Sequence, residues 1–503
     1  MNYLKFQLND CSSFKRKLKG KDLKIIYLIL FPILSAFLLT LSSPGYDIWF
    51  LSFISFIPIL VSLEDRNYFF LKISLFSISY YFYNLLWLNS SVSHFGNAPL
   101  VVGLMVVLGM AIYMTFYLLL FFYSYVKTKN TLIQGLIFVI IEIIRGKIFT
   151  GFPWLNLGLN LYSADFFTNF YSIFGEYGVS FFIIIVNLAI FQIVIKKNYK
   201  NFYILCSLPI LLIIINVLEK DHFKDQNINI SIVQHGLRQE EKWLPEKREE
   251  IVEDILNLTF DAVTKESNLI VLPESLFPFF VQNDNVTFDT LKFLSEYKDI
   301  LIGNIRYDEE LNFYNSAFFF SNREVSFYDK IHLVPFGEYF PLKILTAPIS
   351  RYFFGDAKDF TKGEKYKIFY TRDGIKLLPL ICYESSFYSL IRKGVNKYDP
   401  DILVVISNDS WFGNTIGRMQ HLAIDIVRAK EFHKPLIRAT QSGISACIDE
   451  KGKILKKLGN DEKGIMNCNI KLTYKKSLFS KYGYLWFALF SAVVVAFTRR
   501  KHR

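Results

Sequence analysis

Long apolar runs alternate with short polar connections over the first 218 residues. A bilayer core of about 30 Å requires roughly 20 apolar residues in a helix. Seven runs approach this length, and one more follows near the end of the chain. The connection after the first run, Ser42-Ser43-Pro44-Gly45, is typical of a turn. The pattern predicts eight membrane-spanning helices, at about 25–42, 48–63, 73–90, 99–125, 131–144, 178–195, 203–218 and 482–498.

Basic residues are distributed unequally over the connections between these runs. With the amino terminus in the cytoplasm, the connections and tails on that side carry 18 lysine and arginine residues, whereas the three short connections on the other side carry only Arg145 and Lys147. Basic residues accumulate on the cytoplasmic side of membrane proteins. An odd number of spans precedes residue 219, so the polar segment 220–480 is predicted to lie outside the cytoplasmic membrane. The three outer connections are 43–47, 91–98 and 145–177.

The composition fits a protein that is partly embedded in a membrane. Hydrophobic residues make up 52% of the chain and charged residues 20%, against about a quarter charged in an average soluble domain. This composition excludes a disordered chain. The net charge of +12 would fit a nucleic-acid-binding protein, but the basic tails 1–24 and 499–503 border predicted spans and are interpreted as topology anchors. We therefore expect no nucleic-acid partner.

Cysteine and histidine residues show no spacing typical of a metal site. The five cysteines are scattered, odd in number and without a C-x-x-C pair, which predicts neither a disulfide framework nor a zinc site. The seven histidines form no H-x-x-x-H or H-E-x-x-H motif, and the sequence has no glycine-rich phosphate loop. We expect no metal and no organic cofactor.

The segment 220–480 alternates between short β-branched runs and helical patterns. Ile228, Ile230 and Ile232 alternate with polar residues as in a half-buried strand, and 245–265 carries an apolar helical stripe. Several other runs are almost continuously apolar, which is typical of strands covered on both faces. The alternation predicts an α/β layered domain of about 250 residues. Further predicted strands are 268–273, 300–305, 316–320, 377–381 and 402–406.

Three reactive side chains follow predicted strands in this segment: Glu274, Lys330 and Cys382. Reactive groups collect at the carboxyl ends of strands in open α/β sheets, so the three can converge. A deprotonated cysteine is a nucleophile, a carboxylate can act as its base, and an ammonium can stabilise an oxyanion and lower the pKa of the thiol. Taken singly, each has a structural explanation: a helix cap, a solvated charge and a small core residue.

The motifs around these residues resemble those of a known family. V-L-P-E-S (271–275), Y-D-K-I-H-L-V-P-F-G-E-Y-F-P (328–341) and I-C-Y-E-S (381–385) are similar to carbon–nitrogen hydrolase, or nitrilase-like, motifs. The last two closely resemble its membrane branch, the apolipoprotein N-acyltransferases. F-T-G-F-P-W-L-N-L-G (149–158) and S-N-D-S-W-F-G (407–413) resemble further motifs of that branch. The resemblance covers nearly the whole chain.

The resemblance implies an α-helical membrane domain of about eight helices and a nitrilase-like αββα sandwich. It also implies transfer of an acyl chain from a phospholipid donor to the α-amino group of the diacylglyceryl-cysteine of an apolipoprotein acceptor. The implied divisions are a cytoplasmic basic terminus (1–24), a seven-helix transmembrane domain (25–218), an extracytoplasmic catalytic domain (220–480), a C-terminal transmembrane helix (482–498) and a cytoplasmic basic tail (499–503).

The same resemblance implies roles for three residues and a cellular location. Cys382 is the expected acyl-accepting nucleophile, Glu274 the general base and Lys330 the residue that stabilises the oxyanion. The acyl chain would pass through a thioester in a ping-pong scheme that needs no cofactor. The implied location is the bacterial cytoplasmic (inner) membrane, with the catalytic domain on the periplasmic face.

Four further residues match positions of the family. Glu338, in F-G-E, is expected to be a second carboxylate that supports the lysine and the thioester. Tyr383 and Glu384 follow the nucleophile and match positions that are important in the family. Trp243 matches a tryptophan near the substrate entrance, in a looser alignment.

Two other functions account for parts of the sequence. A membrane-anchored amidase with the same three residues would let water resolve the thioester, but it leaves the G-F-P-W motif and the eight spans without a purpose. A transporter with a large external domain would explain the spans, but it leaves the glutamate, lysine and cysteine motifs unexplained and lacks paired broken helices.

Two features have open interpretations. Arg145 and Lys147 lie near the predicted outer face of the membrane, where they either snorkel to the interface or contact a phospholipid headgroup. The apolar stretch 342–355, which includes Phe353 and Phe354, either packs as a core segment or forms a flap that covers the thioester.

Overall fold

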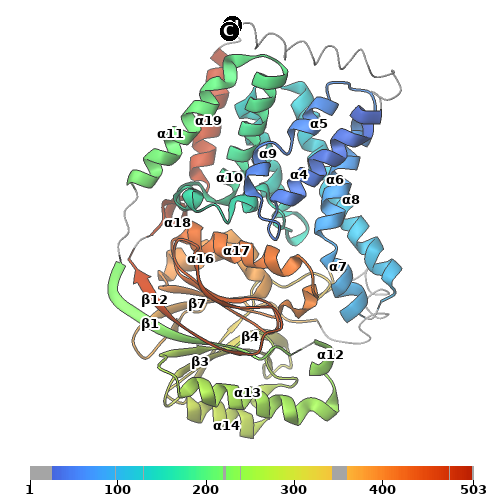
Figure 1. The fold of residues 1–503 in the computed structure, drawn as a ribbon. Coiled ribbons are helices and arrows are strands. Elements are labelled where there is room, and N and C mark those ends of the chain that lie inside the picture. Colours follow the sequence, from blue (N-terminus) through green and yellow to red (C-terminus); the bar gives the residue numbers. More distant parts are fainter. Residues whose placement is uncertain are drawn as a thin grey trace.

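A bundle of helices stands on a two-sheet sandwich (Figure 1). The computed structural model describes residues 25–96, 98–128, 130–218, 223–237, 239–341, 359–474 and 476–500. The chain first builds the bundle, then passes through the sandwich, and returns to the bundle with its last helix. The apolar runs of the sequence thus lie on one side of the molecule and the alternating α/β segment on the other.

The bundle is built from the apolar helices of the first part of the chain and from α19. α9 begins after Asn130, whose side chain accepts hydrogen bonds from the backbone N–H groups of Leu132 (3.0 Å) and Ile133 (3.1 Å), as is usual at a helix start. α10 is bent at Gly175, where φ is 69°. The helices are α4 (Phe31–Ser42), α5 (Ile57–Ser62), α6 (Phe69–Asn84), α7 (Trp87–Asn89), α8 (Leu100–Lys127), α9 (Thr131–Arg145), α10 (Thr168–Ile190), α11 (Phe202–Leu218) and α19 (Leu485–Arg500).

Three helical stretches of the described residues are long and apolar enough to cross a membrane: Leu100–Lys127, Asp165–Ile195 and Tyr199–Val217. A fourth is obtained when Phe69–Asn84 and Trp87–His94, which meet at an angle of 50°, are taken as one span. The predicted count of eight is therefore not confirmed. The shorter apolar helices are Ile26–Ser42, Trp49–Ser62 and Leu485–Val494.

The sandwich consists of two six-stranded sheets with the orders β12-β1-β2-β3-β4-β5 and β11-β10-β9-β8-β7-β6. The inner pairs β1–β2, β2–β3, β7–β8 and β8–β9 are parallel. All predicted strands are present, although β2 is shorter than predicted. The strands are β1 (Phe223–Gln234), β2 (Leu269–Val271), β3 (Asp299–Tyr307), β4 (Phe313–Ser321), β5 (Glu324–Asp329), β6 (Phe369–Tyr370), β7 (Lys376–Ile381), β8 (Ile402–Ser407), β9 (Leu436–Thr440), β10 (Ser445–Ile448), β11 (Ile454–Leu458) and β12 (Gly464–Thr473).

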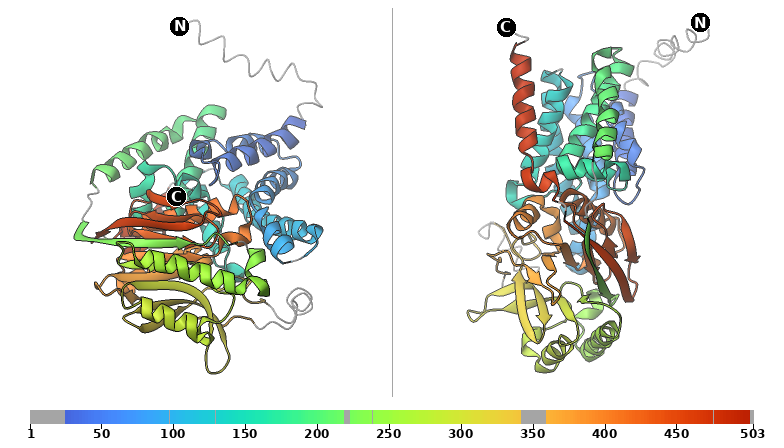
Figure 2. Two further views of the ribbon diagram at one scale, coloured as in Figure 1. Left: turned by 60° about the horizontal axis from the view of Figure 1, so that its bottom comes forward. Right: turned by 90° about the vertical axis from the view of Figure 1, so that its left-hand side faces the viewer.

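Helices cover both outer faces of the paired sheets, which confirms the αββα sandwich. A core between the sheets contains Ile230, Leu301 and Val404. A second core joins one sheet to the helices beside it through residues such as Ile255 and Leu291. The covering helices are α13 (Arg248–Val263) and α14 (Asn285–Leu294) on one face, and α16 (Tyr388–Tyr398) and α17 (Gly417–Phe432) on the other (Figures 1 and 2).

A disulfide joins Cys447 on β10 to Cys468 on β12, one strand from each sheet. The Cα atoms are 6.6 Å apart and both side chains are buried in the core between the sheets. The sequence-based expectation of no disulfide was wrong. The pairing depends on which strands face each other across the sandwich. The spacing of cysteines along the sequence does not predict this arrangement of strands.

α17 lies between the sandwich and the bundle, and buried charges fix it there. Arg428 forms ion pairs with Glu176 of α10 and with Glu431 of its own helix. Lys430 Nζ donates to the carbonyl oxygen of Tyr162 (2.7 Å). A buried charge is tolerated when it is paired or hydrogen-bonded, so these contacts define a specific docking of the two parts.

All three loops that the charge distribution assigns to one membrane face touch the sandwich domain. Gly45 lies against Ile416. Ser91 Oγ donates to the carbonyl oxygen of Trp411 (2.8 Å), and Thr168 Oγ1 donates to a carbonyl oxygen of the β10–β11 turn (3.2 Å). The predicted outer connections and the α/β domain therefore lie on the same side of the bundle.

Candidate active site

Glu274 stands in a turn directly after β2. The next residue, Ser275, has a left-handed backbone (φ 49°), which turns the chain away from the sheet. The carboxylate is buried: Oε1 accepts a hydrogen bond from Asn315 Nδ2 (2.7 Å), and Oε2 accepts one from the backbone N–H of Asn408 (2.8 Å). Both contacts aim the carboxylate into the space between the two sheets' strand ends.

Lys330 follows β5 and is also buried, with an exposed fraction of 1%. Its Nζ lies 2.9 Å from Glu338 Oε1 and 3.6 Å from Glu274 Oε1. Burial opposes the charge of this ammonium, but the carboxylates of Glu338 and Glu274 and the sulfur of Cys382 outweigh it and raise the pKa of Lys330 above its ordinary value. The raised pKa favours the charged ammonium form of Lys330 in the site.

Cys382 is the first residue after β7 and has a left-handed backbone (φ 50°). Only a few per cent of residues other than glycine adopt this conformation, and they cluster at functional sites. The turn Cys382–Ser386 then leads into α16. The sharp change of direction takes the thiol out of the β7 ladder and places it beside the other two residues.

Burial raises the pKa of the Cys382 thiol, and the negative charges of Glu274 and Asp409 raise it further. Lys330 and the hydroxyl of Ser407 lower it, but they do not outweigh burial. We expected a lowered pKa from the sequence. The lysine acts in the expected direction, but the raised pKa favours the neutral thiol, which is the form that a base would ionise.

Asn315, at the start of β4, connects the two carboxylates of the site and was missed in the sequence analysis. Its Nδ2 donates to Glu274 Oε1 and to Glu338 Oε1, at 2.7 Å each. Glu338 Oε2 in turn accepts from the backbone N–H of Val334 (2.7 Å). Two donors, Asn315 and Lys330, thus lie against both carboxylates. The only sequence signal was a polar residue just ahead of an apolar strand.

Glu384 joins the segment of the lysine to the strand of the cysteine. Its Oε1 accepts hydrogen bonds from the hydroxyl of Tyr328 (2.8 Å) and from the backbone N–H groups of Ile331 (2.7 Å) and His332 (3.1 Å). Its Oε2 accepts from the backbone N–H of Ile381 (2.9 Å). The side chain is fully buried, and its contacts cross-link the segment that follows Lys330 to the end of β7.

Tyr383 points the other way, toward the bundle. Its hydroxyl donates to the carbonyl oxygen of Gly151 (3.1 Å), in the G-F-P-W loop. Its ring lies 6.4 Å from that of Trp154 and 5.0 Å from that of Phe387, measured between centroids. Trp154 Nε1 donates to Gln420 Oε1 on α17 (2.7 Å). The membrane loop therefore forms one wall beside the cysteine.

Comparison with known proteins covers both parts of the chain. Residues 35–189 match the apolipoprotein N-acyltransferase N-terminal domain, and residues 229–477 match the carbon-nitrogen hydrolase domain. The apolipoprotein N-acyltransferase of Haemophilus influenzae is 32% identical over 449 residues, which cover 85% of each chain. That of Haemophilus ducreyi is 30% identical over 482 residues, which cover 91% of this chain and 94% of its own. This chain belongs to the apolipoprotein N-acyltransferase family.

A solved carbon-nitrogen hydrolase from Helicobacter pylori is 16% identical, with 49% of this chain and 89% of that chain covered and a TM-score of 0.36.

Within the described residues, no group of three or more His, Cys, Asp or Glu side chains is arranged to hold a metal ion.

Trp243, the family position that was aligned most loosely, lies after α12 (Gln239–Lys242) with 53% of its side chain exposed. The preceding Lys242 is buried, and its Nζ lies 5.5 Å from the centroid of the Trp243 ring. A half-exposed indole is compatible with a residue at a substrate entrance, so this assignment stays a prediction.

Arg145 supports the membrane loop of this acyltransferase-family chain from inside the bundle. It is 3% exposed, donates to the carbonyl oxygen of Trp154 (3.2 Å) and to Asn156 Oδ1, and lies 4.0 Å from Glu142. Neither interfacial snorkelling nor headgroup contact fits this buried position. For Arg145 both interpretations were wrong, because the loop folds back over the end of α9 and supplies partners; for Lys147 they stay predictions. Lys147 is exposed, and the apolar stretch 342–355 lies outside the described residues.

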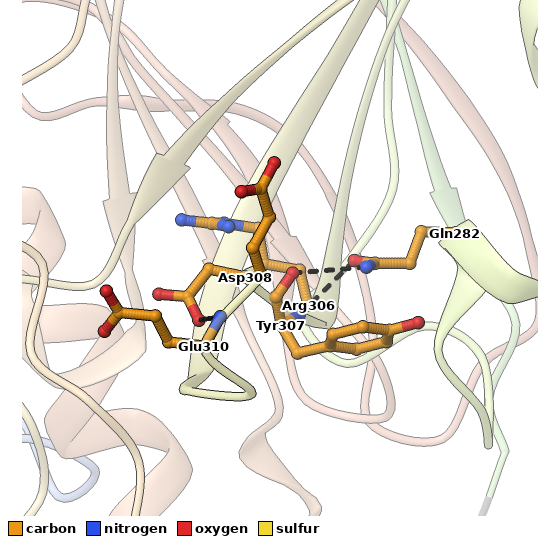
Figure 3. Close-up of a pocket in the computed structure, with 6 residues that line it drawn as sticks. Gln282, Arg306, Tyr307, Asp308 and Glu310 are labelled. Atoms are coloured by element: carbon orange, nitrogen blue, oxygen red, sulfur yellow. Dashed lines mark hydrogen bonds between the residues drawn. The ribbon is translucent and has the colours of Figure 1, made fainter.

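An open surface cavity of about 540 Å³ lies at the end of β3, apart from these site residues (Figure 3). Its rim includes Gln282, Arg306 and Asp308. Arg306 is already paired: its Nε and Nη2 lie 2.6 and 2.5 Å from the two carboxylate oxygens of Asp329. Arg306 therefore holds the side chain of Asp329, the residue before Lys330, at the rim of this cavity.

Proposed function

We propose that this chain transfers an acyl chain from a membrane phospholipid to the α-amino group of an N-terminal diacylglyceryl-cysteine on a lipoprotein. The observation that carries the proposal is that the turn of Cys382 contacts the G-F-P-W loop through Tyr383, while Lys330 Nζ and Glu274 Oε1 lie 3.6 Å apart. Tyr383 and Trp154 join the cysteine turn to the membrane domain. Family membership supports the same reaction, since the relatives are named apolipoprotein N-acyltransferases.

In the first half-reaction, Glu274 takes the proton of the Cys382 thiol and Sγ attacks the ester carbonyl carbon of the phospholipid. Negative charge develops on the carbonyl oxygen, and the ammonium of Lys330 stabilises it. The C–O bond then breaks. The lysophospholipid leaves with the proton that Glu274 held, and a thioester remains on Cys382. The raised pKa of the thiol makes the base necessary.

In the second half-reaction, the neutral α-amino group attacks the thioester carbonyl. Glu274 accepts a proton from the attacking nitrogen and returns it to sulfur as the C–S bond breaks, which gives an amide and the free thiol. Glu338 keeps Lys330 charged and in place through both steps. Amines attack thioesters more readily than water does, so a thioester suits transfer to nitrogen.

We further infer eight spans, a bacterial inner-membrane location and a periplasmic α/β domain. Three observations support this topology. Basic residues collect on one set of connections, the other set contacts the sandwich, and the sandwich contains a disulfide. Disulfides form in oxidising compartments outside the cytoplasm. A reporter active only in the cytoplasm should be silent when fused after Glu219 and active when fused after Arg503; the reverse result would refute the topology.

The experiment that tests the reaction uses phospholipid with a labelled acyl chain. Purified protein should acquire the label on Cys382 as a bond that hydroxylamine cleaves, and addition of a diacylglyceryl-peptide with a free amino terminus should move the label to that amine. An acetylated peptide of the same sequence is the control. Label that passes to water at the same rate with either peptide would favour the amidase and overturn the acyltransferase proposal.

A further inference from the structure

A second buried lysine, Lys242, lies close to the site, against the turn that follows Glu274. It ends α12, and its side chain is 1% exposed although the next residue, Trp243, is half-exposed. Its Nζ donates to the carbonyl oxygen of Ser275 and to Gln441 Oε1 (3.3 Å). Burying an ammonium is costly unless it is hydrogen-bonded. These contacts therefore mark a specific position of the lysine, and neither of its two acceptors is charged.

The carbonyl group that Lys242 binds belongs to the turn that aims the general base. Ser275 follows Glu274 directly, and its left-handed backbone (φ 49°) is disfavoured for any residue with a side chain. On its inner side the turn rests on β3, where Gly303 leaves no room for a Cβ atom against the backbone of Glu274. On its outer side Lys242 holds it. The turn is clamped between a strand and a lysine.

Gln441 fixes the same segment to the end of β8. Its Nε2 donates to the carbonyl oxygen of Leu237 (3.3 Å), and its backbone N–H donates to the carbonyl oxygen of Ser407 (3.1 Å). Asn408, the next residue after Ser407, donates to the Glu274 carboxylate. The loop of Lys242 is therefore tied to both groups that define the position of the base: the turn at Ser275 and the end of β8.

The electrostatics agree with this geometry. Burial lowers the pKa of Lys242 to about 7, and the negative charge of Glu274 opposes that decrease. The negative charge of Glu274 thus stabilises the protonated form of Lys242. On its other side, α12 contacts the bundle, since Glu240 pairs with His94. Lys242 and its helix connect the membrane domain, the half-exposed Trp243 and the turn of the base.

We propose that Lys242 is a positioning residue for the transfer reaction: it clamps the Ser275 turn so that Glu274 faces the thiol. The inference rests on the proposed role of Glu274 as the base. Because Lys242 acts through Glu274, its removal should slow ionisation of Cys382 and leave the affinity for phospholipid largely unchanged.

The test compares Lys242→Met, which keeps the length of the side chain and removes the donor, with Lys247→Met. Lys247 is exposed and pairs with Glu241 (3.5 Å), so its variant is the matched control. The measured quantity is the rate of thioester formation at saturating labelled phospholipid, expressed per Cys382 thiol that can be titrated. We expect a decrease of about 10–100-fold for Lys242→Met, as for a slight misplacement of a catalytic group, and no change for Lys247→Met.

A double-mutant cycle separates this inference from the role of Glu274. In a Glu274→Gln background, Lys242→Met should cause no further decrease, because residues that act through one another are not additive. A slow Glu274→Gln variant together with a normal Lys242→Met variant would refute the positioning role alone. A normal Glu274→Gln variant would refute the base itself. If Lys242→Met does not fold, Gln441→Leu removes one acceptor of the lysine and should show a smaller decrease; a wild-type rate there would also refute the proposal.

Discussion

Replacing Glu384 by glutamine tests whether the lysine segment and the cysteine strand are held together by one buried carboxylate. Glutamine keeps the volume of the side chain and one carbonyl oxygen. If that oxygen stays at the three donors around Ile331, the new NH₂ group faces the backbone N–H of Ile381, which then loses its acceptor. If the amide is reversed, the Tyr328 hydroxyl and the backbone N–H groups of Ile331 and His332 lose their acceptor.

The first orientation sets the magnitude. Burial raises the pKa of Glu384 to about 7, so the comparison is made above that pH, where the carboxylate is ionised. A hydrogen bond to a charged group contributes about 1.5–3 kcal/mol, and a buried donor without a partner costs about 1–3 kcal/mol. We expect Glu384→Gln to lower the free energy of unfolding of the sandwich by about 3 kcal/mol. For a domain of this size that corresponds to a decrease in melting temperature of about 6–12 °C. The turn at Cys382 should also shift relative to Lys330, and a shift near 1 Å costs about 10²-fold in rate.

The assay follows thermal unfolding in detergent and thioester formation from labelled phospholipid, with the rate expressed per folded molecule. Glu364→Gln is the control, because Glu364 is exposed on the same domain. A Glu384→Gln variant with wild-type melting and wild-type rate would refute the cross-link. A variant that melts normally but forms no thioester would also refute it, since Glu384 would then act in the chemistry.

Three further outcomes follow from the site and the sandwich. Cys382→Ser should fold but form no acyl-enzyme, because a hydroxyl has a pKa far above that of a thiol; detection of an ester on the serine would contradict this. Lys330→Met should slow thioester formation by about 10²–10³-fold. Because Lys330 lowers the thiol pKa, the same variant should also shift alkylation of Cys382 by iodoacetamide to higher pH, whereas an unchanged profile would remove Lys330 from the site. Replacing Cys447 and Cys468 by serine should lower the stability by about 3 kcal/mol, as for a closed loop of roughly 20 residues; free thiols at these positions in the native protein, found by mass spectrometry before reduction, would exclude the disulfide.

The positions of Glu274, Lys330 and Cys382 beyond the ends of strands could be predicted from the sequence, because these residues stand where apolar runs end. Glu274 follows a run that becomes β2, and Cys382 follows the run that becomes β7. In a layered α/β domain, such positions meet at one edge of the sheets. The residue types then restrict the chemistry. The family motifs added Glu338 and Glu384, but not the contacts that show how Glu384 works.

The position of Asn315 in the site could not be predicted, because its side-chain contacts are with residues distant in the sequence and no local sequence pattern marks them. Its amide meets Glu274, 41 positions away, and Glu338, 23 positions away. Nothing in the local sequence distinguishes it from any polar residue at the start of a strand. Cys447 and Cys468 present the same difficulty. Their pairing exists only once the two sheets face each other.

The membrane part shows a related limit. Hydropathy predicted where apolar helices occur, but it could not predict that Gly175 bends one long helical stretch. Nor could it predict that Arg145 is buried. An arginine at the end of an apolar run usually reaches the interface. Here Glu142, three residues earlier, and the returning loop at Trp154 satisfy it inside the bundle.

The buried loop at Gly151 and Trp154 also bears on the choice between water and an amine as the final acceptor. Glu274, Lys330 and Cys382 by themselves would serve hydrolysis equally well. What differs is the wall beside the cysteine, where the Tyr383 hydroxyl binds the carbonyl oxygen of Gly151 and Trp154 is fixed to α17. Aromatic side chains at this position displace water, and exclusion of water protects a reactive intermediate from hydrolysis. In the proposed reaction a thioester must wait for a lipoprotein and needs that protection, so we infer that the membrane domain contributes to the chemistry as part of the site and not only as an anchor.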